Sequence, residues 1–314
     1  METTNKMLPT SGRCGEQLNW RLQADTLFIE GKGEMWARSM LPWNSWHGNL
    51  DPKLFSKLVI ESGCTMISDR AFLEHPSLVE VSIPDTVHWI GPDSFSDCEW
   101  LKSITVHPSN PVYASENGLL IDKRTQTLQL CPAGQTGKVS IPCGIVKIGE
   151  CSCSCDENIT EVDIPLGVEI IMQEAFYGCD KLEKVHFPAS LKEIDSEAFG
   201  RCPKLKTVVL PAGAVILDYA FEGCESLASV SLPSDMTRIF KSTFEACTSL
   251  REITIPDTVT IIDQWAFRDC TGFTSLVIPD SVTEIGKDAF KNVPHIIYHG
   301  SAHSEDNWGA LSRN

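Results

Sequence analysis

The chain has 314 residues, with 26 Lys and Arg against 42 Asp and Glu, which gives a formal net charge of −16. A surface this acidic repels phosphate backbones and anionic lipid headgroups, so the composition argues against nucleic-acid binding and membrane-surface attachment. No stretch approaches about 18 consecutive apolar residues, so the sequence predicts no transmembrane helix and no membrane insertion. A chain of this length exceeds one ordinary core and predicts either two domains or an elongated array.

Residues 1–12 are polar, short and without periodicity, so we expect them to be disordered. They also lack the apolar core that a signal peptide needs. This favours a cytoplasmic protein if the chain is the full gene product, or an exported protein whose leader has been removed.

Residues 13–57 precede the first repeat described below and are predicted to form an N-terminal cap. The alternating stretches "LNWRL" and "TLFIEG" predict a pair of strands. The segment also holds four of the eight tryptophans, which are Trp20, Trp36, Trp43 and Trp46. The first coil of a repeat array exposes its core and needs such a cover.

A motif of about 23 residues recurs between residues 58 and 295. A small residue precedes a Phe, most often with a Cys three residues later, then a Leu and a short apolar strand that ends in Pro. The phenylalanines are Phe72, Phe95, Phe176, Phe199, Phe221, Phe244, Phe267 and Phe290. A repeat of roughly 20 to 29 residues around an L-x-x-L-x-L core predicts a leucine-rich solenoid.

The stretch "LEKVHF" shows how one coil is expected to fold. Val185 and Phe187 lie two residues apart and share one face of a strand, while His186 points the other way. Pro188 then ends the strand because it has no N–H for a neighbouring ladder. Stacked coils would form a parallel sheet over one core. The predicted fold is therefore mainly β, or α/β, with ~23-residue coils and little helix.

The cysteines recur at one phase of the coil. Those in the regular repeats are Cys98, Cys179, Cys202, Cys224, Cys247 and Cys270. Equivalent side chains in stacked coils run parallel and do not face each other, so we expect a buried cysteine ladder of reduced thiols and no disulfides. The alternative, a disulfide framework, is typical of short secreted domains with irregular spacing.

The regular spacing fails once, where 81 residues separate Phe95 from Phe176. The missing Phe position falls at Cys153, which leaves a step of 58 residues from Phe95, 35 more than one coil. We predict that residues 107–137 form a hairpin-like insertion that projects from the solenoid. A smaller irregularity follows Pro211, where the coil is one residue short before Phe221.

Cys151, Cys153 and Cys155 are candidate metal ligands. Thiolates at alternate positions could share a face and bind zinc or copper(I), with Cys131 or Cys143 as a fourth ligand. The alternative is that Cys153 fills the Phe position of a degenerate coil. Structural zinc sites usually use two closely spaced pairs, which are absent here.

The tail, residues 296–314, is predicted to cap the last coil. Next to it, His295, His299 and His303 recur every four residues, which on a helix would align three imidazoles as candidate metal ligands. The intervening Ile, Tyr and Gly residues instead predict a strand and a turn. No nucleophile elbow, phosphate loop or dinucleotide fingerprint occurs, so we expect neither an enzyme nor a cofactor.

The outward face of the sheet is the remaining candidate for binding, because solenoids use such extended surfaces. Its polar positions include Glu161, Asp163, Lys184, His186, Glu252 and Thr254. The face has no aromatic anchors of the kind that dominate binding hot spots. Trp89 and Trp100 are better anchor candidates because they interrupt a pattern of aliphatic and small polar residues. A merely solvated face is the alternative.

The repeat unit Cys-x-x-Leu-x-x-Ile-x-Ile-Pro-x-x-Val-x-x-Ile-x-x-x-Ala-Phe resembles the bacterial surface-antigen, or BspA-like, leucine-rich repeat. The resemblance extends from about Cys14 to Trp308. "CGEQLNWRLQADTLFIEGKGEMW" is similar to the opening module of that family, residues 110–134 to its hairpin-like insertion, and "IIYHGSAHSEDNW" to its closing segment. The resemblance implies a surface-exposed or secreted binding protein. The chain departs from it by lacking an export leader and by carrying "CSCSC" in place of one Ala-Phe.

Three functions remain open at this stage. The first is a non-enzymatic, monomeric adhesion protein that presents its repeat surface to a protein or glycan on a host or neighbouring cell. The second is a cytoplasmic scaffold of the same fold that binds another protein. The third is a thiol-metal protein that uses the Cys151 region.

Overall fold

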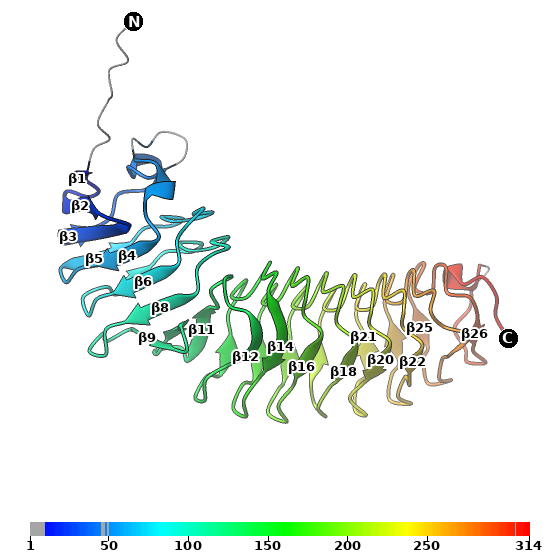
Figure 1. The fold of residues 1–314 in the computed structure, drawn as a ribbon. Helices are drawn as coiled ribbons and strands as arrows, with labels where there is room; N and C mark the ends of the chain where they lie inside the picture. Colours follow the sequence, from blue (N-terminus) through cyan, green and yellow to red (C-terminus); the bar gives the residue numbers. More distant parts are fainter. Residues whose placement is uncertain (1–9, 45–47, 49, 305) are drawn as a thin grey trace, which may run out of the picture. The chain divides into compact units, whose positions relative to one another are not determined.

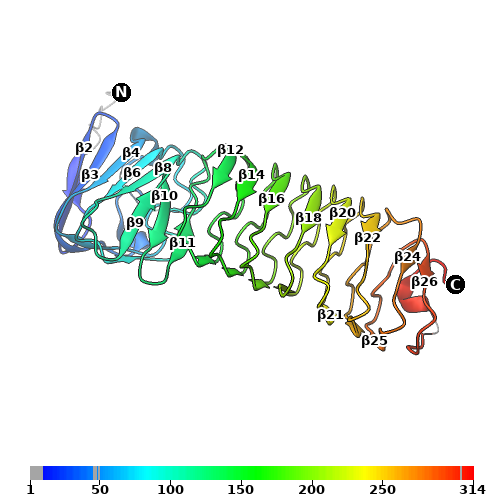
Figure 2. The same cartoon turned by 90° about the horizontal axis from the view of Figure 1, so that it is seen from below.

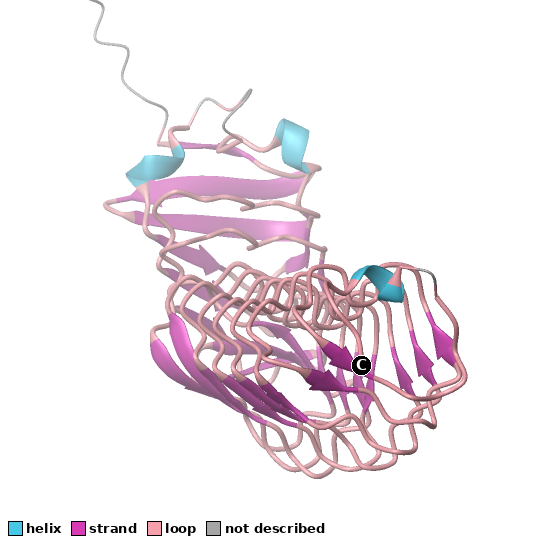
Figure 3. Cartoon of the chain, turned by 90° about the vertical axis from the view of Figure 1, so that its right-hand side faces the viewer, coloured by secondary structure: helices cyan, strands magenta, loops and turns pink. Residues whose placement is uncertain are grey.

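The computed structural model confirms a solenoid of about 23-residue coils with parallel sheets and almost no helix (Figure 3). It describes residues 10–44, 48, 50–304 and 306–314. These fall into two compact units, one running to Arg124 and including Cys131–Gln135, the other comprising Thr125–Leu130 and Thr136–Asn314. Within the described ranges, the structure has no helix with the length and apolar character needed to span a bilayer.

The N-terminal unit begins with the strand pair that the alternating pattern predicts. Its strands are β1 Ser11–Arg13, β2 Gln17–Gln23, β3 Thr26–Glu34, β4 Lys57–Ile60, β5 Cys64–Ile67, β6 Glu80–Ile83, β7 Trp89–Ile90 and β8 Ser103–Val106, with 3-10 helices η1 Arg38–Met40 and η2 Pro52–Leu54. β1, β2 and β3 are antiparallel, after which β4, β6 and β8 add in parallel (Figure 1).

Of residues 1–12, which the sequence predicts to be disordered, the structure describes only residues 10–12. Residues 1–9 lie outside the described ranges, as does Trp46. Ser11 and Gly12 belong to β1 and pair with β2, so the expectation is wrong for these two residues. They are ordered because β2 offers them an edge for backbone hydrogen bonds.

The hairpin predicted within residues 107–137 is present, since β9 Tyr113–Glu116 and β10 Leu119–Asp122 pair antiparallel. The expectation that it projects from the coils is wrong. Tyr113, Leu119 and Leu120 are buried. The N–H of Ile104 in β8 also donates to the Gly118 carbonyl at 2.9 Å. The apolar side chains of the hairpin need cover, and the edge of β8 supplies backbone partners, so the hairpin packs against the coil.

Two ladders of parallel strands form the C-terminal unit (Figures 1 and 2). The main sheet contains β12 Gly137–Ser140, β14 Ile159–Asp163, β16 Lys184–His186, β18 Thr207–Val209, β20 Ser229–Ser231 and β22 Glu252–Ile253. The second ladder contains β11 Thr127–Leu130, β13 Lys147–Ile148, β15 Ile170–Ile171, β17 Glu193–Ile194 and β19 Val215–Ile216, and after an interruption β21 Arg238–Ile239, β23 Ile261–Ile262 and β25 Glu284–Ile285. β24 Leu276–Val277 pairs with β26 Ile296–Ile297.

Stacked phenylalanines fill the core of the coils. Phe176 and Phe199 stack with ring centroids 5.1 Å apart, and further pairs follow up to Phe267 and Phe290 at 5.8 Å. In the N-terminal unit the cap extends such a stack, because Trp43 lies on Phe72 with centroids 5.1 Å apart. In each coil that carries the Phe, its ring therefore fills the space between successive turns.

The cysteine side chains sit beside these rings and are buried. Each thiol donates to the carbonyl oxygen of the residue in the Phe position of the preceding coil, at 3.0 to 3.3 Å. The donors are Cys98, Cys179, Cys202, Cys224, Cys247 and Cys270. A small residue with a weak donor suits this position because it satisfies a buried carbonyl without adding bulk.

The tail of the chain lies on the last coil. The Phe290 N–H donates to the Trp308 carbonyl at 3.0 Å, and the Leu311 N–H donates to the Val293 carbonyl at 2.9 Å. Trp308, in the 3-10 helix η3 Asn307–Gly309, is buried and meets the Tyr298 ring edge-on. The tail thereby pairs backbone groups that the last coil would otherwise expose.

Candidate functional site

A group of charged side chains lies on the outward face of the main sheet. We call Lys138, Glu161, Asp163 and His186 the charged cluster. They come from β12, β14 and β16, whose registers place Lys138 opposite Glu161 and Asp163 opposite His186. Because side chains alternate along a strand, the residues next to them point inward and are buried, namely Val139, Val162 and Val185.

The cluster is held by short polar contacts. Lys138 Nζ lies 3.0 Å from Glu161 Oε1 and 2.7 Å from Asp163 Oδ2. His186 Nε2 lies 3.0 Å from the same Glu161 oxygen. Glu161 is therefore shared between the strand before it and the strand after it. Glu161, Asp163 and His186 were predicted from the sequence as contact residues. The structure adds Lys138 to them.

The electrostatics of the cluster follow from these contacts. Hydrogen bonds from Lys138 and then His186 lower the pKa of Glu161, and Lys184 adds a smaller charge effect from the next strand. The two carboxylates in turn raise the pKa of Lys138, with Asp163 the larger cause. All four side chains keep between 29% and 48% of their surface exposed, so water screens the pairs and they add little to folding stability.

Three members of the cluster have the donor types of a metal site. Glu161, Asp163 and His186 each offer one ligand atom, and these atoms lie within 4.8 Å of one another. Two carboxylates and an imidazole suit several divalent ions. However, Lys138 Nζ already contacts both carboxylates, so a dication would have to displace a positive side chain. The geometry therefore favours an ion-pair network.

Comparison with known proteins identifies the repeat. The sequence matches the BspA type leucine rich repeat region in six copies, over residues 52–118, 146–271 and 204–300. These ranges cover more than half of the chain. The protein belongs to the BspA-type leucine-rich repeat family. No curated protein gives a significant match.

Several solved structures are similar in fold. A leucine-rich repeat protein from Eubacterium ventriosum is 21% identical, with a TM-score of 0.61, covering 94% of this chain and 96% of its own. A leucine rich cell surface protein from Faecalibacterium prausnitzii is 20% identical, with a TM-score of 0.54 and coverages of 78% and 94%. The pneumococcal vaccine antigen PcpA is 14% identical, with a TM-score of 0.51 and coverages of 87% and 92%.

The other predicted contact residues of this BspA-type chain lie apart from the cluster. Glu252 belongs to β22 and Thr254 follows it, and both are exposed. β18 and β20 separate β22 from β16, a distance of about 14 Å at the usual strand spacing. In the N-terminal unit, Trp89 on β7 and Trp100 in the turn before β8 keep 48% and 58% of their surface exposed.

The structure does not bring the three thiols of "CSCSC" together on one face. The segment forms turns and no strand, with left-handed backbone at Cys151 and Cys155. Cys153 is buried in the Phe position, whereas Cys151 is half-buried and Cys155 is exposed. Of the described residues, these sulfurs form no group with metal-ligand spacing. The alternation expected of a strand fails because the repeat makes this segment turn.

The three histidines near the C-terminus also lie outside any helix. His295 immediately precedes β26, and His299 and His303 follow it, as the strand-and-turn interpretation predicts. His295 Nδ1 lies 2.7 Å from Ser312 Oγ in the tail.

Sequence reasoning missed two titratable residues in the core of the coils. Asp156 and His75 each occupy the position three residues after the Phe position, which is Cys in the regular coils. Burial raises the pKa of Asp156 to about 7 and lowers the pKa of His75 to about 4. Counting from the Phe positions would have identified both.

Proposed function

We propose that this protein binds a protein partner through the outward face of the main sheet, centred on the charged cluster and Lys184. The supporting observation is that four charged side chains and the His186 imidazole, from three neighbouring strands, converge there. Next to them the same face presents Thr207 and Val209, and then Ser229 and Ser231. Glu252 and Thr254 would extend the contact along the coils. Repeat solenoids of this type typically act by binding proteins over such surfaces.

The mixed charge of the cluster suits recognition of a partner with complementary charges. Charged groups on a contact surface mainly set specificity, orientation and association rate. Glu161 and Asp163 would meet basic groups of the partner, while Lys184 and His186 would meet acidic ones. The half-exposed state of the cluster leaves these groups available, because their internal pairs are weak enough to exchange.

We place the partner outside the producing cell, as for an adhesin. The support is that a similar structure carries the description of a leucine rich cell surface protein. A cytoplasmic scaffold is the second candidate, and the buried thiols favour it, since a ladder of reduced cysteines is typical of a reducing compartment. Both candidates use the same face and differ in where the partner is found.

Capture of partners by variants of the protein tests the site. The protein, a Lys138→Ala/His186→Ala variant and a Lys192→Ala control would be used as baits on host surface extract and on lysate of the producing organism. Lys192 pairs with Glu169 at 2.8 Å on the side of the second ladder, so the control removes an ion pair elsewhere. We expect at least tenfold weaker capture of the specific partner by the double variant only, equivalent to about 1.4 kcal/mol.

Two outcomes contradict the proposal. Equal capture of the same proteins by all three baits would remove the charged cluster from the site. Loss of capture only in a Trp89→Ala/Trp100→Ala variant would move the site to the N-terminal unit. A partner captured from host surface extract would support the adhesin, and a partner captured from lysate of the producing organism would support the scaffold.

A further inference from the structure

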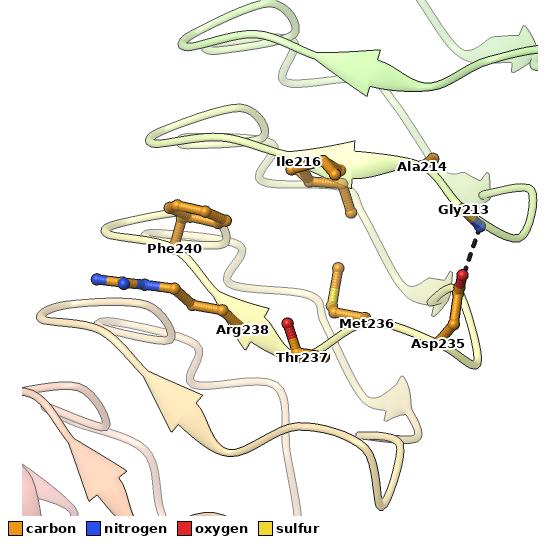
Figure 4. A pocket seen from close by; sticks show the side chains of 9 residues that line it. Gly213, Ala214, Ile216, Asp235, Met236, Thr237, Arg238 and Phe240 are labelled. Atoms are coloured by element: carbon orange, nitrogen blue, oxygen red, sulfur yellow. Dashed lines mark hydrogen bonds between the residues drawn. The ribbon is translucent and has the colours of Figure 1, made fainter.

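The second ladder is interrupted between β19 and β21, and a groove opens there (Figure 4). Among the described strands, β19 pairs with β17 and β21 pairs with β23, but β19 and β21 do not pair with each other. The main sheet stays paired across the same two coils, through β18 and β20. The coils therefore separate on one side only.

The cause lies in the length of one coil. Five residues lead from Pro211 to Ile216, whereas six lead from Pro188 to Ile194 and from Pro233 to Ile239. The shortened segment still reaches the preceding coil, because the Val215 N–H donates to the Lys192 carbonyl at 2.8 Å. It cannot also remain aligned with the following coil.

Two rungs of the backbone ladder are missing as a result. Elsewhere the residue after the Ile donates to the Ile of the preceding coil, as from Leu217 to Ile194 and from Asp263 to Ile239, both at 2.9 Å. The equivalent bond from Phe240 to Ile216 does not form in the part of the chain that the structure describes.

The second missing rung lies earlier in the coil, with its donor three residues and its acceptor two residues before those of the first. Thr260 donates to the Thr237 carbonyl at 2.9 Å, but for the described residues no bond from Thr237 to Ala214 is found. Together the two rungs leave N–H donors on the β21 wall of the groove and carbonyl acceptors on the β19 wall. These donors and acceptors are therefore available to a ligand with matching groups.

Both ends of the groove are closed. The Gly213 N–H donates to Asp235 Oδ1 at 3.0 Å at one end, as drawn in Figure 4. The Tyr219 N–H donates to the Lys241 carbonyl at 2.8 Å at the other. The groove encloses about 250 Å³, below the roughly 300 to 1,000 Å³ of pockets for whole drug-sized ligands. Its size and its two closed ends favour one small group over a peptide strand that runs through it.

The side chains of the groove are largely apolar. Ile216 and Met236 form its floor. Phe240 lies beside them, and the Arg238 guanidinium is held 5.1 Å from the ring centroid and paired with Asp263 at 2.7 Å. The corresponding position in the next coil is Asp263, so an aromatic ring at the rim is specific to this coil.

We propose that this groove binds the acetamido group of an N-acetylated sugar. The amide carbonyl would accept from the Phe240 or Thr237 N–H, and the amide N–H would donate to the Ile216 or Ala214 carbonyl, which replaces a missing rung. The methyl group would contact Met236, and the apolar face of the pyranose ring would lie on Phe240. The site is separate from the charged cluster and does not depend on the protein partner proposed above.

The test uses methyl N-acetyl-β-glucosaminide as the probe and methyl β-glucoside, which has a hydroxyl in place of the acetamide, as its matched control. Titration followed by two-dimensional NMR should shift the Thr237 and Phe240 amide signals with the first sugar only. We expect saturation with a dissociation constant on the order of 1 to 10 mM, as befits one small group. A glutamine-containing peptide, titrated in parallel, offers the same amide chemistry from a protein.

Variants of the groove complete the test. Insertion of one Ser after Ala212 restores the regular length of the coil and should close both rungs and abolish the shifts. If that variant fails to fold, Phe240→Asp, which installs the residue of the next coil, should weaken binding at least tenfold. Lys138→Ala/His186→Ala should leave the shifts unchanged. Three outcomes would each overturn the proposal. They are equal shifts with the glucoside, tighter binding of the peptide, and no shifts at 50 mM N-acetylated sugar, a concentration on the order of five times the weakest expected dissociation constant.

Discussion

At the scale of single residues, Asp156 and His75 show what happens when an ionisable group occupies the cysteine position. The Asp156 Oδ1 atom accepts from the N–H groups of Asn158 and Ile159, at 2.7 and 3.1 Å, while its Oδ2 atom has no hydrogen-bond partner among the described residues. His75 packs against the Phe55 ring with centroids 4.4 Å apart. Burial disfavours the charged form of both, which shifts the two pKa values in opposite directions.

We predict that Asp156 destabilises the protein as pH rises. Its pKa in the folded protein, about 7, lies above the ordinary 3.8. Its stabilising contribution to the free energy of unfolding is therefore complete below about pH 4 and is lost as pH rises through 7. Between pH 5 and 8 the free energy of unfolding should fall by about 2 to 4 kcal/mol more in the parent protein than in Asp156→Asn. Urea unfolding at both pH values measures this. If the free energy of unfolding changed equally with pH in the parent and in Asp156→Asn, ionisation of Asp156 would cost the folded protein little.

His75 should act in the opposite sense. Its pKa in the folded protein, about 4, lies below the ordinary 6.5. Its stabilising contribution to the free energy of unfolding is therefore present above pH 6.5 and is lost as pH falls toward 4. His75→Cys restores the residue of the regular coils. Going from pH 7.5 to 4.5, the variant should lose about 2 kcal/mol less stability than the parent. Thermal unfolding of the two proteins in matched buffers provides the measurement, and equal losses would contradict the assignment.

At the scale of the coil, the sequence predicted the strands and the core well because their spacing repeats. Val185 in β16 is buried as expected, as are Phe199 and Phe244. Phe187 follows the strand instead of belonging to it and is half-buried, with its ring edge-on to Phe199 at 5.5 Å between centroids. The charged cluster was only partly predictable. Glu161, Asp163 and His186 follow from alternation, but Lys138 lies in a coil whose register the irregular insertion obscures. The groove after Pro211 was visible only as one missing residue, since the loss of two backbone rungs depends on how coils stack.

Truncation of a core ring tests the stacking directly. Phe244 is buried between Phe221 and Phe267, with ring centroids 6.0 and 5.6 Å away. Phe244→Ala should lower the free energy of unfolding by about 3 to 5 kcal/mol, because the rings on either side limit how far the cavity can collapse. A melting temperature within a degree of the parent would show that the position is not part of the core.

The thiols of the regular coils are expected to be reduced and protected. Burial raises the pKa of Cys224, Cys247 and Cys270 far above the usual value, and only a thiolate reacts quickly. These three, with Cys179 and Cys202, should resist alkylation in the native protein and react fully in denaturant. Cys143 is exposed and should label early. Mass spectrometry reads out each site, and disulfides between successive members would contradict the reduced ladder.

At the scale of the whole chain, a solenoid is stabilised by contacts between neighbouring coils, so stability is approximately a sum of local terms. Coils that do not contact one another can therefore unfold independently. The two compact units carry different titratable core residues, His75 in the N-terminal unit and Asp156 in the C-terminal one. The pH at which each unit weakens should therefore differ.

Hydrogen exchange resolved by peptide should reveal this difference. After correction for intrinsic exchange rates, lowering the pH from 7 to 4.5 should selectively reduce protection around Phe55 and Phe72, which contact His75. Raising the pH from 5 to 8 should instead reduce protection around Ile159 and Cys179 in the C-terminal unit, because Asp156 becomes charged beside them. His75→Cys and Asp156→Asn should each remove only its own effect. If both pH changes loosened all coils equally, the chain would be unfolding as one cooperative body, and coil-by-coil stability would be the wrong description.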